Sequence, residues 1–281
     1  MLRNTRTLQG LSGTLTDLSP NLSDIHAQTK VIPLDTGDFI YLGSDLPFNH
    51  RYFDVTVVND QAASWTVEIW SGTQWVPVVD VIDETSVGGV TLAQSGIISW
   101  TPDPDADSWC FDDTDDMTGS GLETLKIFGL YWARLTISAA IKVTTALNYV
   151  GHKFSNDSAM VAEYPDLGRS ALMTSFKAGK TSWNEQHLLA AEYIVGDLRS
   201  QKNLLTSPDQ ILVWDNYEKA GVHRTAMLIF QAMGEDYVRE LAQAAANYKR
   251  ALDVGNHQID KNGNATLEEG ERVKTNVFMT R

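Results

Sequence analysis

The sequence predicts an α+β protein, in which an N-terminal antiparallel β-sandwich or jelly-roll-like domain is followed by a C-terminal α-helical bundle. Short runs of alternating apolar and polar residues, separated by turn residues about every ten positions, indicate strands in the first half. After Ser182 the apolar residues recur at helical spacing instead. A chain of 281 residues has room for two such domains, since a domain usually has about 100–200 residues.

Residues 1–30 are predicted to form an N-terminal arm or a short edge segment. Leucines recur there at helix-like spacing, but Gly10, Gly13 and Pro20 interrupt the run. The basic residues at the N-terminus are not followed by an apolar run, so we expect no signal peptide. We also find no apolar stretch long enough to cross a bilayer, so no membrane partner is expected.

The predicted β-sandwich domain comprises residues 31–152. Its strands are predicted at residues 39–43, 52–58, 65–70, 75–79, 96–100 and 131–137. Trp70 and Trp75 flank the turn residues 71–73, which predicts a β-hairpin.

Aromatic residues are frequent in these predicted strands. They are Trp65, Trp70, Trp75, Trp100, Tyr131 and Trp132. At strand spacing such residues usually belong to the core of a sandwich. The alternative is a platform on which sugars stack, as in a carbohydrate-binding module.

The net charge of −14 is concentrated in the first half of the chain. Residues 1–152 contain 7 Lys and Arg against 19 Asp and Glu, a net charge of −12, and the remaining residues contain 15 against 17, a net charge of −2. An acidic domain repels phosphates, which disfavours sequence-specific nucleic-acid binding. The acidic run at residues 103–116 is interpreted as a solvated loop, with binding of cations or of a basic partner as the alternative.

Residues that support catalysis or a cofactor are not grouped in the sequence. Cys110 is the only cysteine, which excludes an internal disulfide and a Cys-based metal site and fits a reducing site of synthesis. The six histidines are scattered, and neither a nucleophile elbow nor a phosphate-binding loop is found. We therefore predict that the protein is not an enzyme and holds no organic cofactor.

Residues 153–181 are predicted to be a linker or docking segment, and residues 182–254 a helical domain. Ser182 and Glu185 have the spacing of a capping box that opens the first helix. Ser207 begins a second start signal, with Pro and Gln following, for a helix that continues to Met233. A third helix is predicted to end at residue 254, with an apolar stripe formed by Val238, Leu241, Ala245, Tyr248 and Leu252.

Polar residues after the third helix are spaced like the ligands of a calcium-binding loop. The candidate ligands are Asp260, Asn262, Asn264, Thr266, Glu268 and Glu271. Hard cations such as Ca²⁺ prefer oxygen ligands at alternate positions of a tight turn, with a bidentate carboxylate at the twelfth position. Ala265 stands where such loops usually have glycine. The alternative is a polar Asn–Gly turn that leads into a short Glu-rich helix.

Residues 182–253 resemble the head–tail adaptor proteins, also called connector or neck proteins, of tailed bacteriophages. The resemblance rests on the capped first helix, the second start signal, the run from His223 to Met233, and an Ala-rich third helix with Tyr237, Tyr248 and Lys249–Arg250. It covers about the last hundred residues. Residues 40–45 and 70–75 in the first half resemble accessory β-sandwich domains of phage virion proteins, a domain that minimal adaptors lack.

The resemblance implies a structural virion protein at the head–tail junction, assembled in the host cytoplasm. Its copies would form a ring of about twelve subunits beneath the portal protein. The ring would also bind the next neck or tail protein, and DNA would pass through its channel without sequence recognition. The expected interface residues are Met227, Phe230, Met233, Tyr237, Tyr248, Val277 and Phe278. The tail, residues 255–281, would dock onto the portal or a neighbouring subunit.

The alternative function is that of an accessory neck, collar, tail or baseplate protein. In that case the β-sandwich domain would bind host glycans or decorate the particle.

Overall fold

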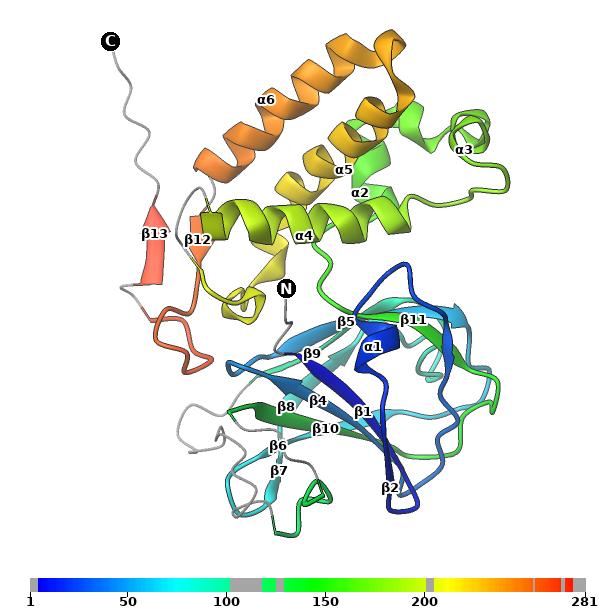
Figure 1. Ribbon diagram of the computed structural model, residues 1–281, viewed down its shortest axis with the longest axis vertical. Coiled ribbons are helices and arrows are strands. Elements are labelled where there is room, and N and C mark those ends of the chain that lie inside the picture. The colour runs from blue at the N-terminus through cyan, green and yellow to red at the C-terminus, as the bar shows by residue number, and fades with distance from the viewer. Residues whose placement is uncertain are drawn as a thin grey trace. The chain divides into compact units, whose positions relative to one another are not determined.

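The protein has an α+β fold, with two antiparallel sheets in its first half and helices mostly in its second half (Figure 1). The computed structural model describes residues 5–101, 118–124, 129–200, 205–254, 256–268 and 271–274. The chain divides into two compact units. Unit 1 extends to Gly151 and includes Asn262–Thr266, and unit 2 comprises His152–Lys261 and the chain from Leu267 onward.

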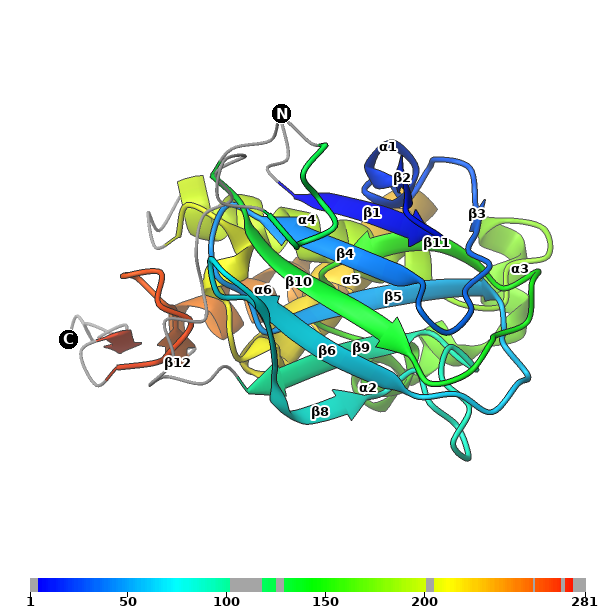
Figure 2. The same cartoon turned by 90° about the horizontal axis from the view of Figure 1, so that it is seen from below.

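Unit 1 contains two sheets in which neighbouring strands are all antiparallel. The six strands of sheet A, in spatial order, are β2 (Thr14–Asp17), β1 (Arg6–Leu11), β4 (Phe39–Ser44), β10 (Tyr131–Ile137), β6 (Trp65–Trp70) and β7 (Trp75–Pro77). The five strands of sheet B are β3 (Lys30–Val31), β11 (Ala146–Gly151), β5 (His50–Val57), β9 (Gly96–Thr101) and β8 (Val79–Asp83). Figure 2 shows β1, β4, β10 and β6 side by side in sheet A.

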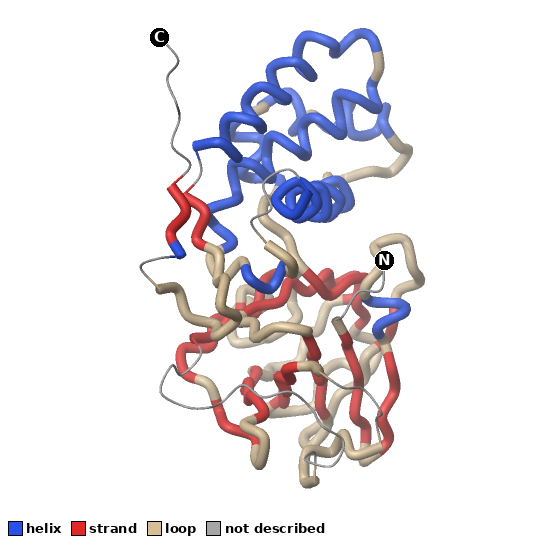
Figure 3. Tube along the Cα trace, turned by 60° about the vertical axis from the view of Figure 1, so that its left-hand side comes forward, coloured by secondary structure: helices blue, strands red, loops and turns tan. Residues whose placement is uncertain are grey.

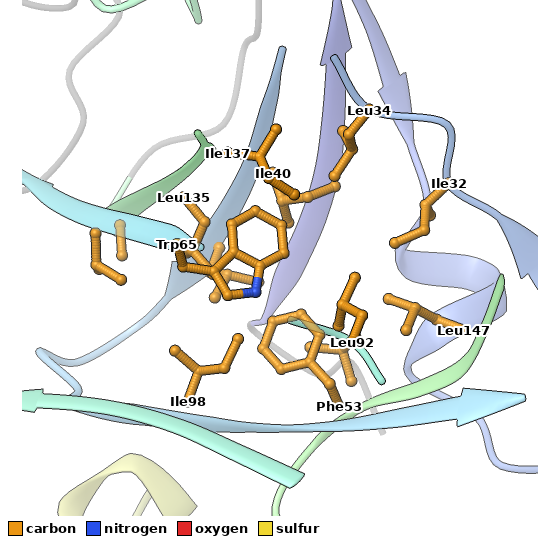
Figure 4. Close-up of a cluster of buried hydrophobic side chains, with 14 of the residues drawn as sticks. Ile32, Leu34, Ile40, Phe53, Trp65, Leu92, Ile98, Leu135, Ile137 and Leu147 are labelled. Carbon is orange, nitrogen blue, oxygen red and sulfur yellow. The ribbon is translucent and has the colours of Figure 1, made fainter. Parts of the chain in front are cut away.

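One hydrophobic core joins the two sheets of unit 1. Ile40 and Leu135 from sheet A meet Phe53 and Ile98 from sheet B, with Trp65 between them (Figure 4). Side chains alternate between the two faces of a strand, so every second residue of β6 belongs to this core. A smaller cluster on the other face of sheet A contains Leu8, Tyr41, Trp70, Leu122, Leu130 and Trp132.

The strands predicted from alternation are present in unit 1, and Trp70 pairs with Trp75 across the predicted hairpin. The run predicted as one strand at residues 75–79 divides instead. Its first part is β7 in sheet A, and Val79 begins β8 in sheet B. Residues 1–30, predicted as an arm, contain β1, β2 and the short helix α1 (Ser19–Leu22).

Unit 2 is mostly helical (Figure 3). Its helices are α2 (Asp157–Glu163), α3 (Ser170–Phe176), α4 (Asn184–Ser200), α5 (Glu218–Met233) and α6 (Val238–Val254), and β12 (Asn256–Gln258) pairs with β13 (Arg272–Lys274). Residues 153–181, predicted as a linker, thus contain α2 and α3. None of the described helices combines the length and the apolar character needed to cross a lipid bilayer.

The two predicted helix-start signals have different outcomes. Ser182 accepts a hydrogen bond from the Asn184 N–H (3.0 Å), where α4 begins. The Ser207 capping box also forms, but it opens only a 3-10 turn at Pro208–Gln210, and α5 begins at Glu218. The prediction of one helix from this signal to Met233 is therefore wrong. The side-chain amide of Gln210 accepts a hydrogen bond from the Thr206 N–H and donates one to the Asp260 carbonyl. These bonds fix a local turn there.

Candidate functional site

A buried polar cluster of unit 2 surrounds His187 in the first turn of α4. Nδ1 of this imidazole lies 2.7 Å from the Ser155 hydroxyl and 3.0 Å from the Thr225 hydroxyl of α5. Nε2 lies 3.1 Å from the Asp157 carboxylate at the start of α2. Thus His187 connects α4 with α5 and with the segment that leads into α2.

The His187 side chain is held in its neutral form. Burial lowers the pKa of His187, and positive charge on Lys153 and Lys180 acts in the same direction, whereas Asp157 opposes the shift. Burial raises the pKa of Asp157, but hydrogen bonds from His187 and Ser182 outweigh it and lower that pKa overall. A neutral imidazole that donates from Nε2 to the carboxylate leaves Nδ1 to accept from the hydroxyls.

The cluster contains the residue types of a nucleophile relay, but its geometry is that of a structural network. Ser155 is only 5% exposed and His187 1%. A substrate would have to separate the helices to reach either side chain. Gly221 of α5 lets the backbone approach this point, because a Cβ there would lie 2.7 Å from the Ser155 hydroxyl. The cluster satisfies its own buried polar atoms and thereby fixes three helices.

Two further buried histidines of unit 2 also connect distant segments. His152 Nε2 lies 3.0 Å from the Asp209 carboxylate, in the turn opened by the capping box. His223 Nδ1 of α5 lies 2.8 Å from the Tyr164 hydroxyl, just after α2. Burial lowers the pKa of His223 and raises the pKa of Tyr164, so both groups are neutral near pH 7.

The predicted calcium ligands belong to a loop with several local hydrogen bonds. Asn262 Oδ1 accepts from the Asn264 N–H (3.1 Å), and Asn264 Oδ1 accepts from the Thr266 N–H (2.9 Å). The Glu271 carboxylate accepts from the N–H groups of Lys261 (2.7 Å) and Glu268 (3.1 Å).

Asp260 and Glu271 of this loop are buried, whereas Asn262 and Asn264 are exposed. Ala265 has a φ of 59°, the left-handed conformation for which calcium loops normally use glycine. In the part of the chain that the structure describes, no three His, Cys, Asp or Glu side chains are grouped as a metal site. A Ca²⁺ site here therefore stays a prediction, with amide and hydroxyl oxygens supplying three of the six candidate ligands.

Calcium binding predicts a measurable gain in stability. A weak site has a dissociation constant of about 10⁻⁴–10⁻³ M, so about 10 mM Ca²⁺ would stabilise the protein by about 1.4–2.7 kcal/mol. We expect Glu271→Gln to abolish this gain and Ala265→Gly to retain it, since glycine adopts the left-handed conformation without strain. Thermal unfolding with Ca²⁺ or with chelator measures the effect, and Glu240→Gln on α6 is the control. Equal gains in all variants would contradict the site.

The predicted interface residues differ in their exposure. Met227, Met233 and Tyr237 are partly exposed, whereas Phe230 and Tyr248 are buried inside unit 2. The Phe230 ring stacks on the Tyr237 ring at 5.7 Å, and the Tyr248 hydroxyl donates to Asp197 (2.7 Å). These two side chains pack against their own unit, and the interface itself stays a prediction. The other two, Val277 and Phe278, lie outside the described residues.

The tryptophans of unit 1 do not form the sugar-stacking platform that was the alternative prediction. Trp65 and Trp100 belong to the core between the sheets. Trp70 and Trp132 are buried on the other face of sheet A. Trp75 and Tyr131 remain partly exposed. The acidic run at residues 103–116 lies outside the described residues.

Sequence patterns did not reveal the His187 cluster. Its members come from three segments that are far apart in the chain, so no spacing motif exists. The available signal was weak: a histidine one residue before the apolar face of the helix that begins after Ser182.

Comparison with known proteins supplies no relative. No family model matches the chain, and no curated protein or solved structure matches it either. The function is therefore inferred from the residues and the geometry of the chain itself.

Proposed function

We propose that the chain is a structural virion protein of a tailed phage, a head–tail connector subunit that forms a ring beneath the portal. The observation that supports this best is the outward face of α6. Val238 is 60% exposed, and Ala242 and Ala246 are exposed on the next two turns of the same face. An apolar stripe of this kind is left uncovered in a single copy.

The composition of this stripe suits contact between helices. Alanine side chains allow two helix axes to approach to about 8 Å, the short end of the usual range. Burying an exposed valine contributes about 1.5 kcal/mol or more, since apolar area is worth about 25 cal/mol per Å². The stripe lies on a single helix, so a different surface of a neighbouring copy would cover it. This head-to-tail contact would then repeat around a closed ring.

The finer features of the fold have roles in this proposal. We take unit 2 as the adaptor bundle that contacts the portal, the next neck protein and the passing DNA. Unit 1 is then an accessory β-sandwich of jelly-roll-like type. The chain passes between sheets A and B from β4 to β5 and again from β5 to β6, as expected for such a sandwich.

The C-terminal segment is more firmly attached than a free tether. Ile259 is fully buried in unit 2, and β12 pairs with β13. Deleting residues from position 255 onward would remove a core side chain and destabilise unit 2. A docking role is therefore assigned to residues after Lys274, and a truncation that tests docking should begin there.

The assembly role is tested by placing a charge on the α6 stripe. We expect the purified chain to form rings when mixed with the portal protein of the same virus, and Ala242→Arg to weaken ring formation by about tenfold or more, because an unpaired guanidinium would be buried. The matched control is Ala171→Arg on the exposed surface of α3. Native mass spectrometry and electron microscopy measure the product.

The outcomes of this experiment are distinguishable. Normal rings from Ala242→Arg would show that α6 is not the lateral face. Absence of any complex between the wild-type chain and the portal would contradict the connector function itself.

A further inference from the structure

We propose that α2 is an acid-releasable element, clamped at its two ends by the buried imidazoles of His187 and His223. The start of α2 is held by the bonds of His187 to Ser155 and Asp157. The residue after its end, Tyr164, is held by His223. Protonation of the two imidazoles would release α2 and the preceding segment from α4 and α5.

The helix is short, and the other polar contacts of its first residue, Asp157, are with the segment before α4: its carboxylate accepts from the Trp183 N–H at 3.1 and 3.2 Å and from Ser182. The helix has seven residues, fewer than an isolated helix needs to be stable in water. Asn156 caps its start by accepting from the Ala159 N–H (2.9 Å), and Met160 is its one fully buried side chain. Its position therefore depends on contacts beyond its own length, and both histidine contacts are among them.

The surroundings of His187 oppose a positive charge. From α2 it faces Asp157, from α5 it faces the neutral Thr225, and Lys153 and Lys180 approach from the segments before α2 and α4. The Lys180 side chain is itself 7% exposed and is 3.9 Å from Glu185. A protonated His187 would thus face one carboxylate and two ammonium groups, while its own ring is fully buried.

The surroundings of His223 act in the same direction. Burial is the main cause that favours its neutral form, Lys219 adds to it, and Glu163 opposes it. The Tyr164 hydroxyl lies 2.8 Å from Nδ1 of His223, and the two rings meet edge-on with their centroids 5.8 Å apart.

The direction of the pH effect follows from these environments. A buried histidine whose pKa is lowered binds fewer protons in the folded state than in the released state. The clamp is therefore complete above the ordinary histidine pKa of about 6.5 and weakens as the pH falls through that value. Each unit by which the pKa is lowered corresponds to about a tenfold change in the clamp equilibrium.

Hydrogen exchange of the full chain at about pH 7.5 and about pH 5, corrected for intrinsic rates, tests the clamp. We expect the protection of the α2 amides to fall by about tenfold or more in acid, while protection of the β5 amides changes little. His187→Gln combined with His223→Gln should remove this difference, and His26→Gln, at an exposed position of unit 1, should leave it unchanged.

The proposal is overturned if α2 and β5 lose protection equally, or if the double variant keeps the acid response. If the double variant does not fold, imidazole NMR of the wild-type chain decides. Titration of both rings below the peptide value of about 6.5, together with release of α2, supports the clamp, and titration at that value overturns it.

Discussion

Replacing Trp183 by Ala is expected to destabilise unit 2 by about 3–5 kcal/mol. The side chain is 0% exposed, and its indole N–H donates to the Leu167 carbonyl at 2.8 Å. Its ring meets Phe176 edge-on at 5.1 Å. The substitution would therefore open a large cavity and leave a buried carbonyl without its donor. Urea unfolding followed by the helical circular dichroism signal measures the loss.

Two further variants make this result specific. Trp183→Phe keeps most of the apolar volume and loses the indole N–H, so we expect a smaller loss of about 1–3 kcal/mol. Trp75→Ala removes a partly exposed ring from unit 1 and should leave the midpoint of the helical transition near that of the wild-type protein. A loss below about 1 kcal/mol for Trp183→Ala would show that the site collapses or is solvated.

Gly96→Ala should destabilise unit 1 by more than about 3 kcal/mol, although it adds a single methyl group. A Cβ at Gly96, in β9, would lie 2.5 Å from the backbone carbon and 2.6 Å from the carbonyl oxygen of Glu84. Glu84 directly follows β8, and its backbone atoms can move only together with that strand. The added methyl group would therefore force β8 and β9 apart at this point. Thermal unfolding, with strand signal and solubility as readouts, measures the effect.

The matched control is the same chemical change in a helix. Gly196 of α4 has open space around its missing Cβ and an ordinary helical backbone. We expect Gly196→Ala to stabilise the protein by about 1 kcal/mol, since alanine has the higher helix propensity. Losses of similar size for both variants would contradict the close approach at Gly96.

Local sequence patterns predicted the elements whose structure is determined by residues close to them in the chain. The alternation in β6 follows directly from one buried face, and α6 ends at Val254, where the sequence predicts the end of the third helix. Segments whose fold depends on distant partners were missed. β1 is a strand because it pairs with β4, although its leucines have helical spacing, and β11 has register shifts against β5 that break its alternation.

The candidate sites show the same limit. The spacing of residues 260–271 was visible because a loop's ligands are neighbours in the chain. The His187 cluster was not, since Ser155 and Thr225 meet only after three helices have packed. Likewise, the capping box at Ser207 forms, but its spacing cannot reveal that Gln210 has a partner fifty residues later.

That partner determines how unit 2 would respond to a mechanical load. Gln210 exchanges two hydrogen bonds with Asp260: its carbonyl accepts from the Asp260 N–H at 2.9 Å, and its amide donates to the Asp260 carbonyl at 2.8 Å. Tension applied to the far end of the chain would therefore reach the turn before α5 and bypass the last turn of α6. The two bonds share that pull, so both would have to break before the load passes to α6.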